Sequence, residues 1–365
     1  MKNKLIIFIF IFIIIFPKLA SLLNIKEPTL NENRVLNSKT PFTFSKNYSK
    51  GFTNYFNDHF GLRNYFIVAD RYLRYKFFNI STNSAVSIGK DHWLFYTPDI
   101  QYVDSVNGQP FSQDDLIQIK NNLLDIQTAF QKQNIKFYFL VAPNKQSIYP
   151  EFLPNHMKKV HPDSRLDQID NFLKNYPQIN FINPKSDLLA TKNQNQIYLK
   201  YDTHWNQLGA FVAYQKLFKK INQDFPSLTP KNLTDFNLSN SVAPNKDLAL
   251  ELGVAGQFFE SSIFVNPKIQ NATTISQDCP EIYTKCPLIV QENPNKKLPR
   301  LLMFRDSFAV SLIPFISEHF QHSYYYWGQV PFPNSLIKQE KPNIIIFELT
   351  ERELWRLKDQ IFSSN

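Results

Sequence analysis

Asp, His and Ser residues that could form a nucleophilic catalytic site lie in two short polar segments of this 365-residue chain. The segment KYDTHWNQLGAF, residues 200–211, places Asp202 and His204 two positions apart, and the segment FRDSFA places Ser307 in a polar turn after an apolar run. A serine nucleophile needs a base within hydrogen-bond reach, and the base needs a third group that fixes its tautomer. This pattern favours Ser307 as nucleophile, His204 as base and Asp202 as the group that orients the imidazole. Asp202 or Thr203 would equally suit the N-cap of a following helix, so the spacing alone leaves both interpretations open.

Five more residues are candidates for contacts with substrate or with an oxyanion. Asn144 and Lys145 follow the apolar run IKFYFLVAP, where they could donate to an oxyanion or an acidic substrate, or lie on an exposed loop. Arg305 directly precedes the Asp-Ser pair of the polar turn. Tyr326 and Trp327 could stack on a sugar ring, although burial in a strand is the more common use of such residues.

No metal site or cofactor is expected from the sequence. His319 and His322 could share one helix face, but no third ligand is visible near them. Cys279 and Cys286 lie in the Pro-flanked segment DCPEIYTKCP, which is typical of a loop. Two cysteines in an exported chain most simply form a local disulfide, whereas a zinc site would need two further Cys or His residues nearby.

The elements that must position these residues alternate between helix and strand. The segment SQDDLIQIKNNLLDIQTAFQKQN predicts a helix that begins after Ser112 as N-cap, and SRLDQIDNFLKNY and HWNQLGAFVAYQKLFKKIN predict two more. Strands are expected at IKFYFLVAP, INFINP, QIYLKYD, LPRLLMF, SYYYWGQV and PNIIIFEL, with an apolar helix after Ser307. This alternation predicts an α/β fold with a mostly parallel sheet and helices on both faces. Ligands bind such sheets beyond the carboxyl ends of the strands, so the D-T-H and R-D-S turns could face one cleft.

The first residues, MKNKLIIFIFIFIIIFPKLASLL, have the charged start and apolar run of an export signal. We expect residues 1–23 to be a signal peptide or an uncleaved signal anchor, residues 24–50 a linker, and residues 51–365 a folded domain with a loop-rich insertion at about 223–298. The formal net charge is +9, but the basic residues are scattered, which argues against a nucleic-acid partner.

Five segments in this order, GKDHWLFY, APNKQSIYPEFLP, YDTHWNQLGAFVAY, FRDSFA and KPNIIIFELTERELW, resemble the AlgJ/AlgX-type polysaccharide O-acetyltransferases, which are SGNH hydrolase-like proteins. The resemblance covers about residues 51–360. It implies an SGNH-like α/β fold with a permuted motif order, in which the serine comes late. It also carries the family's catalytic Asp, His and Ser onto Asp202, His204 and Ser307.

The same resemblance implies a periplasmic enzyme, anchored in the bacterial inner membrane, that acetylates sugar hydroxyls of an exported polysaccharide through an acetyl-Ser307 intermediate. A membrane O-acyltransferase of the MBOAT type would deliver the acetyl group. Arg305 departs from the Gly that simple SGNH esterases have before the Asp-Ser pair, and no C-terminal carbohydrate-binding module is expected after ERELW, which places the chain nearer the AlgJ type. A carbohydrate O-acetylesterase with the same triad, or a non-catalytic polysaccharide-assembly scaffold, remains an alternative.

Overall fold

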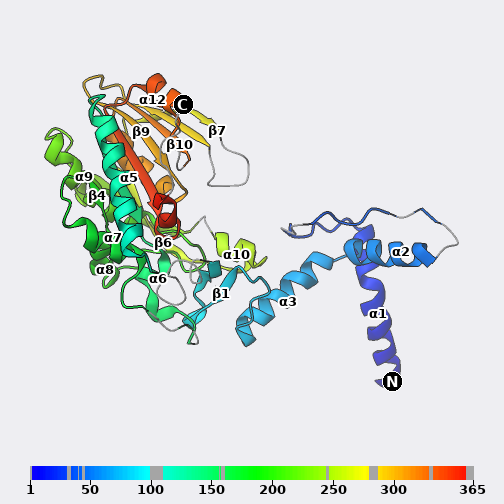
Figure 1. The fold of residues 1–365 in the computed structure, drawn as a ribbon. Coiled ribbons are helices and arrows are strands. Elements are labelled where there is room, and N and C mark those ends of the chain that lie inside the picture. The colour runs from blue at the N-terminus through cyan, green and yellow to red at the C-terminus, as the bar shows by residue number, and fades with distance from the viewer. Residues whose placement is uncertain are drawn as a thin grey trace. The chain divides into compact units, whose positions relative to one another are not determined.

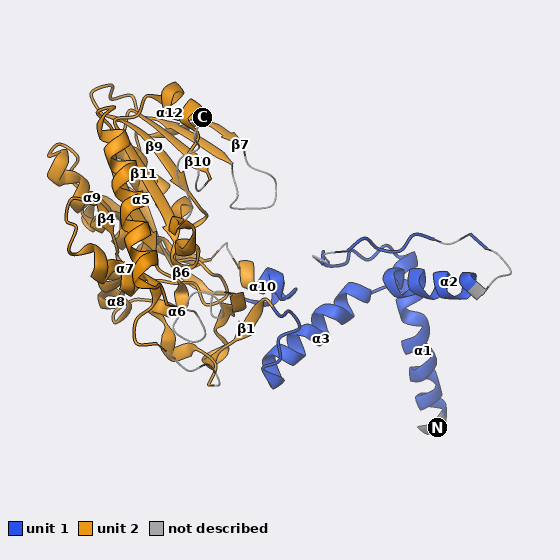
Figure 2. Ribbon diagram, in the orientation of Figure 1, with its two compact units in different colours: residues 1–84, 249–258 blue, residues 85–248, 259–365 orange. Residues whose placement is uncertain are grey.

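The computed structural model of the chain forms two compact units (Figure 2). One unit holds residues 1–84 and 249–258, and the other holds residues 85–248 and 259–365. The structure describes residues 2–30, 34–39, 41–42, 46–98, 110–155, 157, 161–243, 246–278, 287–328 and 332–358.

The first unit is built on three helices, α1 (Lys2–Leu22), α2 (Lys46–His59) and α3 (Arg63–Phe78), with a short turn η4 (Ala255–Gln257). The span Lys4–Leu22 of α1 is long and apolar enough to cross a membrane. The residues expected to be a linker make defined contacts in this unit: the Glu27 carboxylate accepts the backbone N–H groups of Leu62 and Asn64 at 2.7 and 2.8 Å. These contacts satisfy N–H groups that the first turn of α3 leaves without a helical partner.

A seven-stranded sheet organises the second unit, in the order β4-β3-β11-β9-β10-β8-β7. The strands from β4 to β10 in this order run parallel, and β8 and β7 add an antiparallel edge. The bounds are β3 (Lys136–Ala142), β4 (Phe181–Ile182), β7 (Thr273–Asp278), β8 (Leu288–Glu292), β9 (Arg300–Arg305), β10 (His322–Trp327) and β11 (Ile344–Thr350). The predicted mostly parallel α/β sheet is therefore confirmed.

The core of this unit lies in two layers, one on each face of the sheet. Alternate β3 residues enter different layers: Tyr138 and Leu140 pack with the helix α9 (Gln207–Asp224), whereas Phe137 and Phe139 pack with α5 (Gln113–Gln131) and α7 (Arg165–Leu173). This is the period of two that a strand imposes. Figure 1 shows α5 running along the sheet. The remaining helices and turns are α6 (Lys145–Ile148), η2 (Pro150–Phe152), α8 (Lys185–Lys192), η3 (Leu233–Asp235), α10 (Asp247–Glu251), η5 (Phe308–Ser311), α11 (Ile313–Ile316), η6 (Ser317–His319), α12 (Asn334–Glu340) and η7 (Glu351–Lys358).

Several local predictions are confirmed. Ser112 caps α5 in a reciprocal capping box with Asp115, as the sequence indicated. The segments SRLDQIDNFLKNY and HWNQLGAFVAYQKLFKKIN contain the predicted helices α7 and α9. Residues 86–96 form a hairpin of β1 (Val86–Ile88) and β2 (Leu94–Tyr96), joined by η1 (Lys90–His92).

Three local predictions are wrong. QIYLKYD is not a strand, because the one β-bridge of this segment is isolated and joins Tyr198 to Trp205. The segment 223–298 is more regular than expected, since β5 (Phe236–Val242), β6 (Ser261–Pro267), β7 and β8 lie in it. β5 is exposed along most of its length, so its polar sequence hid the strand. The helix after Ser307 is instead the two short turns η5 and α11, and the missing N–H of Pro314 prevents a longer ladder there.

Candidate active site

Asp202, His204 and Ser307 form one hydrogen-bonded chain. The Nδ1 atom of His204 lies 2.6 Å from Oδ1 of Asp202, and its Nε2 atom lies 2.7 Å from Oγ of Ser307. The backbone N–H of His204 also donates to Asp202 Oδ1 at 2.9 Å. The two-residue spacing thus lets one carboxylate hold both the ring and the backbone of the histidine, which is the arrangement that activates a serine.

The alternative capping role of Asp202 and Thr203 is wrong. The N-cap of α9 is Asn206, whose side chain accepts the backbone N–H of Gly209 at 3.0 Å. Asp202 is therefore available to the imidazole.

Two further contacts hold the histidine loop against the serine turn. The indole N–H of Trp205 donates to the backbone carbonyl of Phe308 at 3.0 Å, and the ring of His204 packs on that of Phe308 with centroids 4.7 Å apart. His204 and Ser307, which are 103 positions apart in the sequence, are thereby placed within hydrogen-bond distance.

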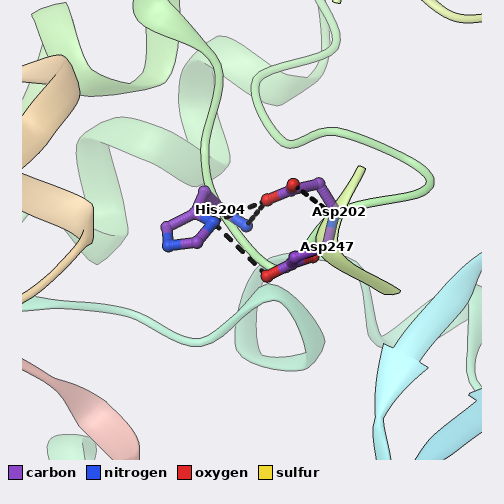
Figure 3. A group of neighbouring side chains, drawn as sticks. All are labelled: Asp202, His204 and Asp247. Carbon is purple, nitrogen blue, oxygen red and sulfur yellow. Dashed lines mark hydrogen bonds and ion pairs between the residues drawn. The ribbon is translucent and has the colours of Figure 1, made fainter. Parts of the chain in front are cut away.

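Asp247, at the start of α10, is a second carboxylate beside the imidazole (Figure 3). Its Oδ2 lies 3.6 Å from His204 Nδ1, and its backbone N–H donates to Asp202 Oδ2 at 2.8 Å. It also accepts the backbone N–H of Thr203 at 2.8 Å and the Thr203 hydroxyl. Nothing in the sequence pattern distinguished this residue, because it lies in a polar segment 45 positions after Asp202.

Burial and neighbouring charges together determine whether the pKa of each of these three side chains is raised or lowered. Burial alone would raise the pKa of Asp202, but the neighbouring His204 and the N–H groups that donate to Asp202 lower it overall. Burial opposes the charged form of His204, yet Asp202 and then Asp247 outweigh burial and raise the pKa of His204. Although 40% of the Asp247 side chain is exposed, the desolvation of its carboxylate and the charge of Asp202 raise its pKa to about 6.

Asp202, His204 and Asp247 also have the residue types of a metal site, with ligand atoms within 4.8 Å of one another. Their oxygens, however, already accept protein donors. Asp202 Oδ1 accepts from His204 and Oδ2 from Asp247, while the two oxygens of Asp247 accept from Thr203 and Leu248. A cation would have to displace these donors, so the donor set fits a histidine-orienting network better than a metal centre.

The turn that carries Ser307 is fixed by the preceding residue. The Asp306 carboxylate accepts the backbone N–H of Phe308 at 2.9 Å through Oδ1, and the N–H of Thr350 at 2.9 Å together with the Thr350 hydroxyl through Oδ2. The backbone N–H of Asp306 donates to Glu348 at 3.0 Å. Burial and the nearby Asp306 raise the pKa of Glu348 well above its ordinary value, which favours the neutral form of this carboxyl. The end of β11 thus supports the nucleophile turn at the end of β9.

Lys145 is placed to support the Asp202 loop. Its side chain is buried, and its ammonium group donates to three backbone carbonyl oxygens at 3.0, 3.2 and 2.6 Å, those of Leu199, Lys200 and Asp202. The ammonium group also lies over the rings of Trp93 and Phe95. These contacts differ from the expected contact with substrate.

The side chain of Asn144 is buried at the carboxyl end of β3. Its backbone N–H donates to Glu351 at 2.9 Å, but its side-chain oxygen and nitrogen make no hydrogen bond within the described part of the chain. A buried amide without partners is costly, which is the situation expected where a substrate supplies the missing partner.

The other residues predicted to contact substrate, and the two cysteines, lie at different positions in the fold. Arg305 is fully buried, donates to the carbonyl of Asp306 at 3.2 Å and lies 5.3 Å from the ring of Trp327, its register partner on β10. Trp327 and Tyr326 are half-buried at the carboxyl end of β10, beside the serine turn. Cys279 and Cys286 lie outside the described residues.

The two histidines considered as metal ligands are engaged by protein groups. Nε2 of His319 lies 2.8 Å from the Tyr214 hydroxyl, and burial lowers the pKa of His319 to about 3. Nε2 of His322 lies 2.9 Å from Glu340. Both histidines therefore have structural partners away from the triad.

Arg352, in the turn that follows β11, is a residue that the sequence did not single out. Its guanidinium lies 5.7 Å from the ring centroid of Phe308 and 5.9 Å from that of Tyr96, and its charge partly opposes the raised pKa of His204. It therefore adds positive charge near the triad. The signal was present in TERELW, a polar segment directly after an apolar strand.

Residues 86–261 match the family model described as "SGNH hydrolase-like domain, acetyltransferase AlgX". Asp202 and His204 lie inside this range and Ser307 beyond it. The probable alginate O-acetylase AlgJ of Pseudomonas syringae pv. tomato is 29% identical over 201 residues, which cover 54% of this chain and 46% of that protein. The chain thus matches less than half the length of this curated relative.

Two solved structures share the fold. PatB1 of Bacillus cereus, solved with a sulfonyl adduct, superposes with a TM-score of 0.54 at 20% identity, covering 74% of this chain and 97% of that structure. A DHHW family protein from Eubacterium siraeum gives a TM-score of 0.51 at 15% identity, covering 75% and 94% of the two chains. At these identities the likeness concerns the fold.

Proposed function

Because residues 86–261 carry the SGNH hydrolase-like domain of the AlgX acetyltransferase type, we propose that this protein is a serine-dependent O-acetyltransferase whose acceptor is a sugar hydroxyl of a polysaccharide. The observation that carries the proposal is the continuous hydrogen-bonded chain from Asp202 through His204 to Ser307. The name of the AlgJ relative, an alginate O-acetylase, supports acetyl transfer to a polysaccharide.

In the first half-reaction, His204 Nε2 takes the hydroxyl proton of Ser307 while Oγ forms a bond to the acetyl carbonyl carbon of the donor. Asp202 stabilises the resulting imidazolium through its bond to Nδ1. The bond between the acetyl carbon and the donor then breaks, and His204 returns the proton to the leaving group. The product is acetyl-Ser307.

In the second half-reaction, the acceptor sugar hydroxyl gives its proton to His204, and its oxygen attacks the acetyl carbon. The Ser307 Oγ leaves and recovers the proton from His204, which restores the enzyme. Water in place of the sugar would make the same site an esterase, so acceptor choice depends on how well the acceptor excludes water.

The oxyanion of each tetrahedral intermediate needs donors that are in place beforehand. We assign the Asn144 amide this role, because it is buried, follows the carboxyl end of β3 on the same edge of the parallel sheet as Ser307, and has no hydrogen-bond partner in the described structure. Arg352 supplies additional positive potential close to His204. Trp327 and Tyr326 offer aromatic surface beside the serine turn for a sugar ring.

The apolar helix α1 supports a location at the membrane. We propose that it anchors the chain with the catalytic unit on the periplasmic side of the inner membrane, where an integral O-acyltransferase of the MBOAT type would deliver the acetyl group. In this arrangement the acetyl group crosses the membrane through the partner, and no cofactor is needed by the chain itself.

The test is intact-mass spectrometry of the full chain in detergent after incubation with an activated acetyl ester or with a sulfonyl fluoride, the class of reagent that leaves a sulfonyl adduct. The wild type should gain one acetyl or one sulfonyl group on Ser307, and the Ser307→Ala variant should gain neither while unfolding at the same urea concentration. Equal labelling of the two proteins would overturn the assignment. Acetate release that is unchanged by added oligosaccharide would favour an esterase.

A further inference from the structure

The helix α2 of the first unit carries an unusual row of aromatic side chains. Tyr48, Phe52, Phe56 and Phe60 recur every four residues, which places them on one face of the helix. Their rings contact one another in sequence, with centroids 6.1 to 6.3 Å apart. The row continues to Phe66 of α3, 6.3 Å from Phe60.

One residue on the other side of α2 is buried. Asp58 is buried, and its carboxylate binds the guanidinium of Arg34 at 2.6 and 3.0 Å and the backbone N–H of Asn37 at 2.8 Å. Residues two positions apart lie about 200° apart around a helix, so Asp58 points away from Phe56. Phe52 and Phe56 remain 51% and 54% exposed. The chain therefore binds Asp58 but leaves the aromatic side chains Phe52 and Phe56 open to another molecule or to a membrane.

The packing of α1 sets the depth of this aromatic face. Gly61, two residues after the end of α2, lies against the Pro17 carbonyl and Ser21 of α1 so closely that a side chain at position 61 would collide with them. Pro17 is five residues from the end of α1 at Leu22, or about 8 Å along the helix axis. Figure 1 shows α2 running across this end of α1. If α1 spans a bilayer, α2 lies where interfacial helices lie, about 5–10 Å into the boundary between headgroups and acyl chains.

The charge of the two helices agrees with this environment. α2, residues 46–59, contains two Lys and one Asp, and α3, residues 63–78, contains four Lys or Arg and one Asp, so each helix carries a net positive charge. A cationic helix with an aromatic face is the usual composition of segments that bind the surface of an anionic bilayer.

We propose that α2 is an interfacial membrane helix whose Phe52 and Phe56 insert into the lipid surface, so that α1 and α2 together hold the first unit at the membrane. The proposal rests on the insertion of α1 proposed above and is independent of the acetyl-transfer chemistry. Its ligand is the anionic phospholipid bilayer, and its function is to fix the height and tilt at which the chain leaves the membrane.

The experiment uses the full chain in nanodiscs of phosphatidylethanolamine and phosphatidylglycerol that contain a phospholipid with a diazirine in the upper acyl chain. Irradiation inserts the carbene into neighbouring side chains, and trypsin then releases residues 51–63 as one peptide, because Lys50 and Arg63 flank it. We expect lipid adducts at Phe52 and Phe56 in addition to those on α1, and none at Asp58.

A matched pair of variants separates insertion from mere proximity. Phe52→Asp with Phe56→Asp should lower adduct formation on the 51–63 peptide by roughly tenfold or more, because two buried aromatic side chains are lost from the lipid. Asn47→Asp with Asn54→Asp makes the same charge change away from the aromatic face and should leave labelling within about twofold of the wild type. Labelling of α1 without labelling of this peptide, labelling of neither segment, or equal labelling in the two double variants would each overturn the proposal.

Discussion

Asp247 offers a direct test of how charge controls the base. Replacing it by Asn removes a carboxylate from beside His204 while keeping an oxygen that can accept from Thr203. A negative charge near an imidazole stabilises the imidazolium, so its removal lowers the pKa of His204. Because the base must be neutral to accept the Ser307 proton, the acid limb of the pH–rate profile should move to lower pH.

The size of the change follows from the geometry. Two unit charges 3.6 Å apart interact by ~1 kcal/mol in a water-like dielectric, which is the appropriate limit for a carboxylate with 40% of its side chain exposed. One pH unit corresponds to about 1.4 kcal/mol, so the acid limb should move down by roughly 0.8 of a pH unit. Since the pKa of Asp247 itself is about 6, the difference between the proteins should be present above that pH and fade below it.

The assay is acetate release from an activated acetyl ester between pH of about 5 and about 9, the range in which histidine bases titrate. Asn54→Asp, a charge change in the other unit, is the control and should leave the profile unmoved. An acid limb that stays in place, or moves to higher pH, in Asp247→Asn would refute the electrostatic reasoning. Loss of activity at all pH values with an unchanged limb would instead show that Asp247 acts only through Thr203.

The other predictions concern three buried side chains. Lys145→Met should lower the free energy of unfolding by only ~1–3 kcal/mol, because the loss of three hydrogen bonds is partly offset by no longer burying an ammonium group. The rate of acetate release should nevertheless fall by at least about tenfold, because the Asp202 loop loses its support. An unchanged rate would contradict this role for Lys145. Because the pKa of Glu348 is raised in the fold, the folded chain holds this proton to a higher pH than the unfolded chain, which loses it above about 4.3, so Glu348 lowers the free energy of unfolding as pH rises. Glu348→Gln should flatten this pH dependence and be at least as stable as the wild type in urea titrations at neutral pH. A large loss of stability at every pH would contradict this reasoning. Asn144→Ala should lower kcat by about a hundredfold with little change in KM or in the urea midpoint, whereas a change confined to KM would argue against an oxyanion donor.

The parts of the fold that repeat a regular period were predictable. The helix α5 has one buried face, so its apolar residues recur with helical spacing. The strands β3 and β11 are buried on both faces, so they read as continuous apolar runs. The strands β5 and β7 were missed, because an exposed strand is free to carry the Asn and Ser residues that loops also prefer.

The residues of the candidate site could likewise be predicted only in part from the sequence. The triad residues could be identified because their chemistry restricts their types and because they follow strands or precede a helix. Asp247 could not be identified, since its importance depends on long-range folding that brings a polar segment beside His204. Arg352 was missed although it lies in a polar segment directly after a predicted strand. The sequence correctly placed Lys145 at the end of a strand, but the direction in which its side chain points depends on backbone carbonyl groups of the distant Asp202 loop.

The position of β11 in the sheet has a consequence for how the protein matures. This strand, late in the sequence at Ile344–Thr350, lies in the middle of the sheet between β3 and β9. The strands β3 and β9, which precede Asn144 and Ser307, are therefore joined in the sheet only through β11, and Thr350 at the end of β11 binds Asp306. A chain emerging from its N-terminus would remain inactive until nearly its whole length had appeared. Pairing over such long separations is slow, so the complete site should form late in folding.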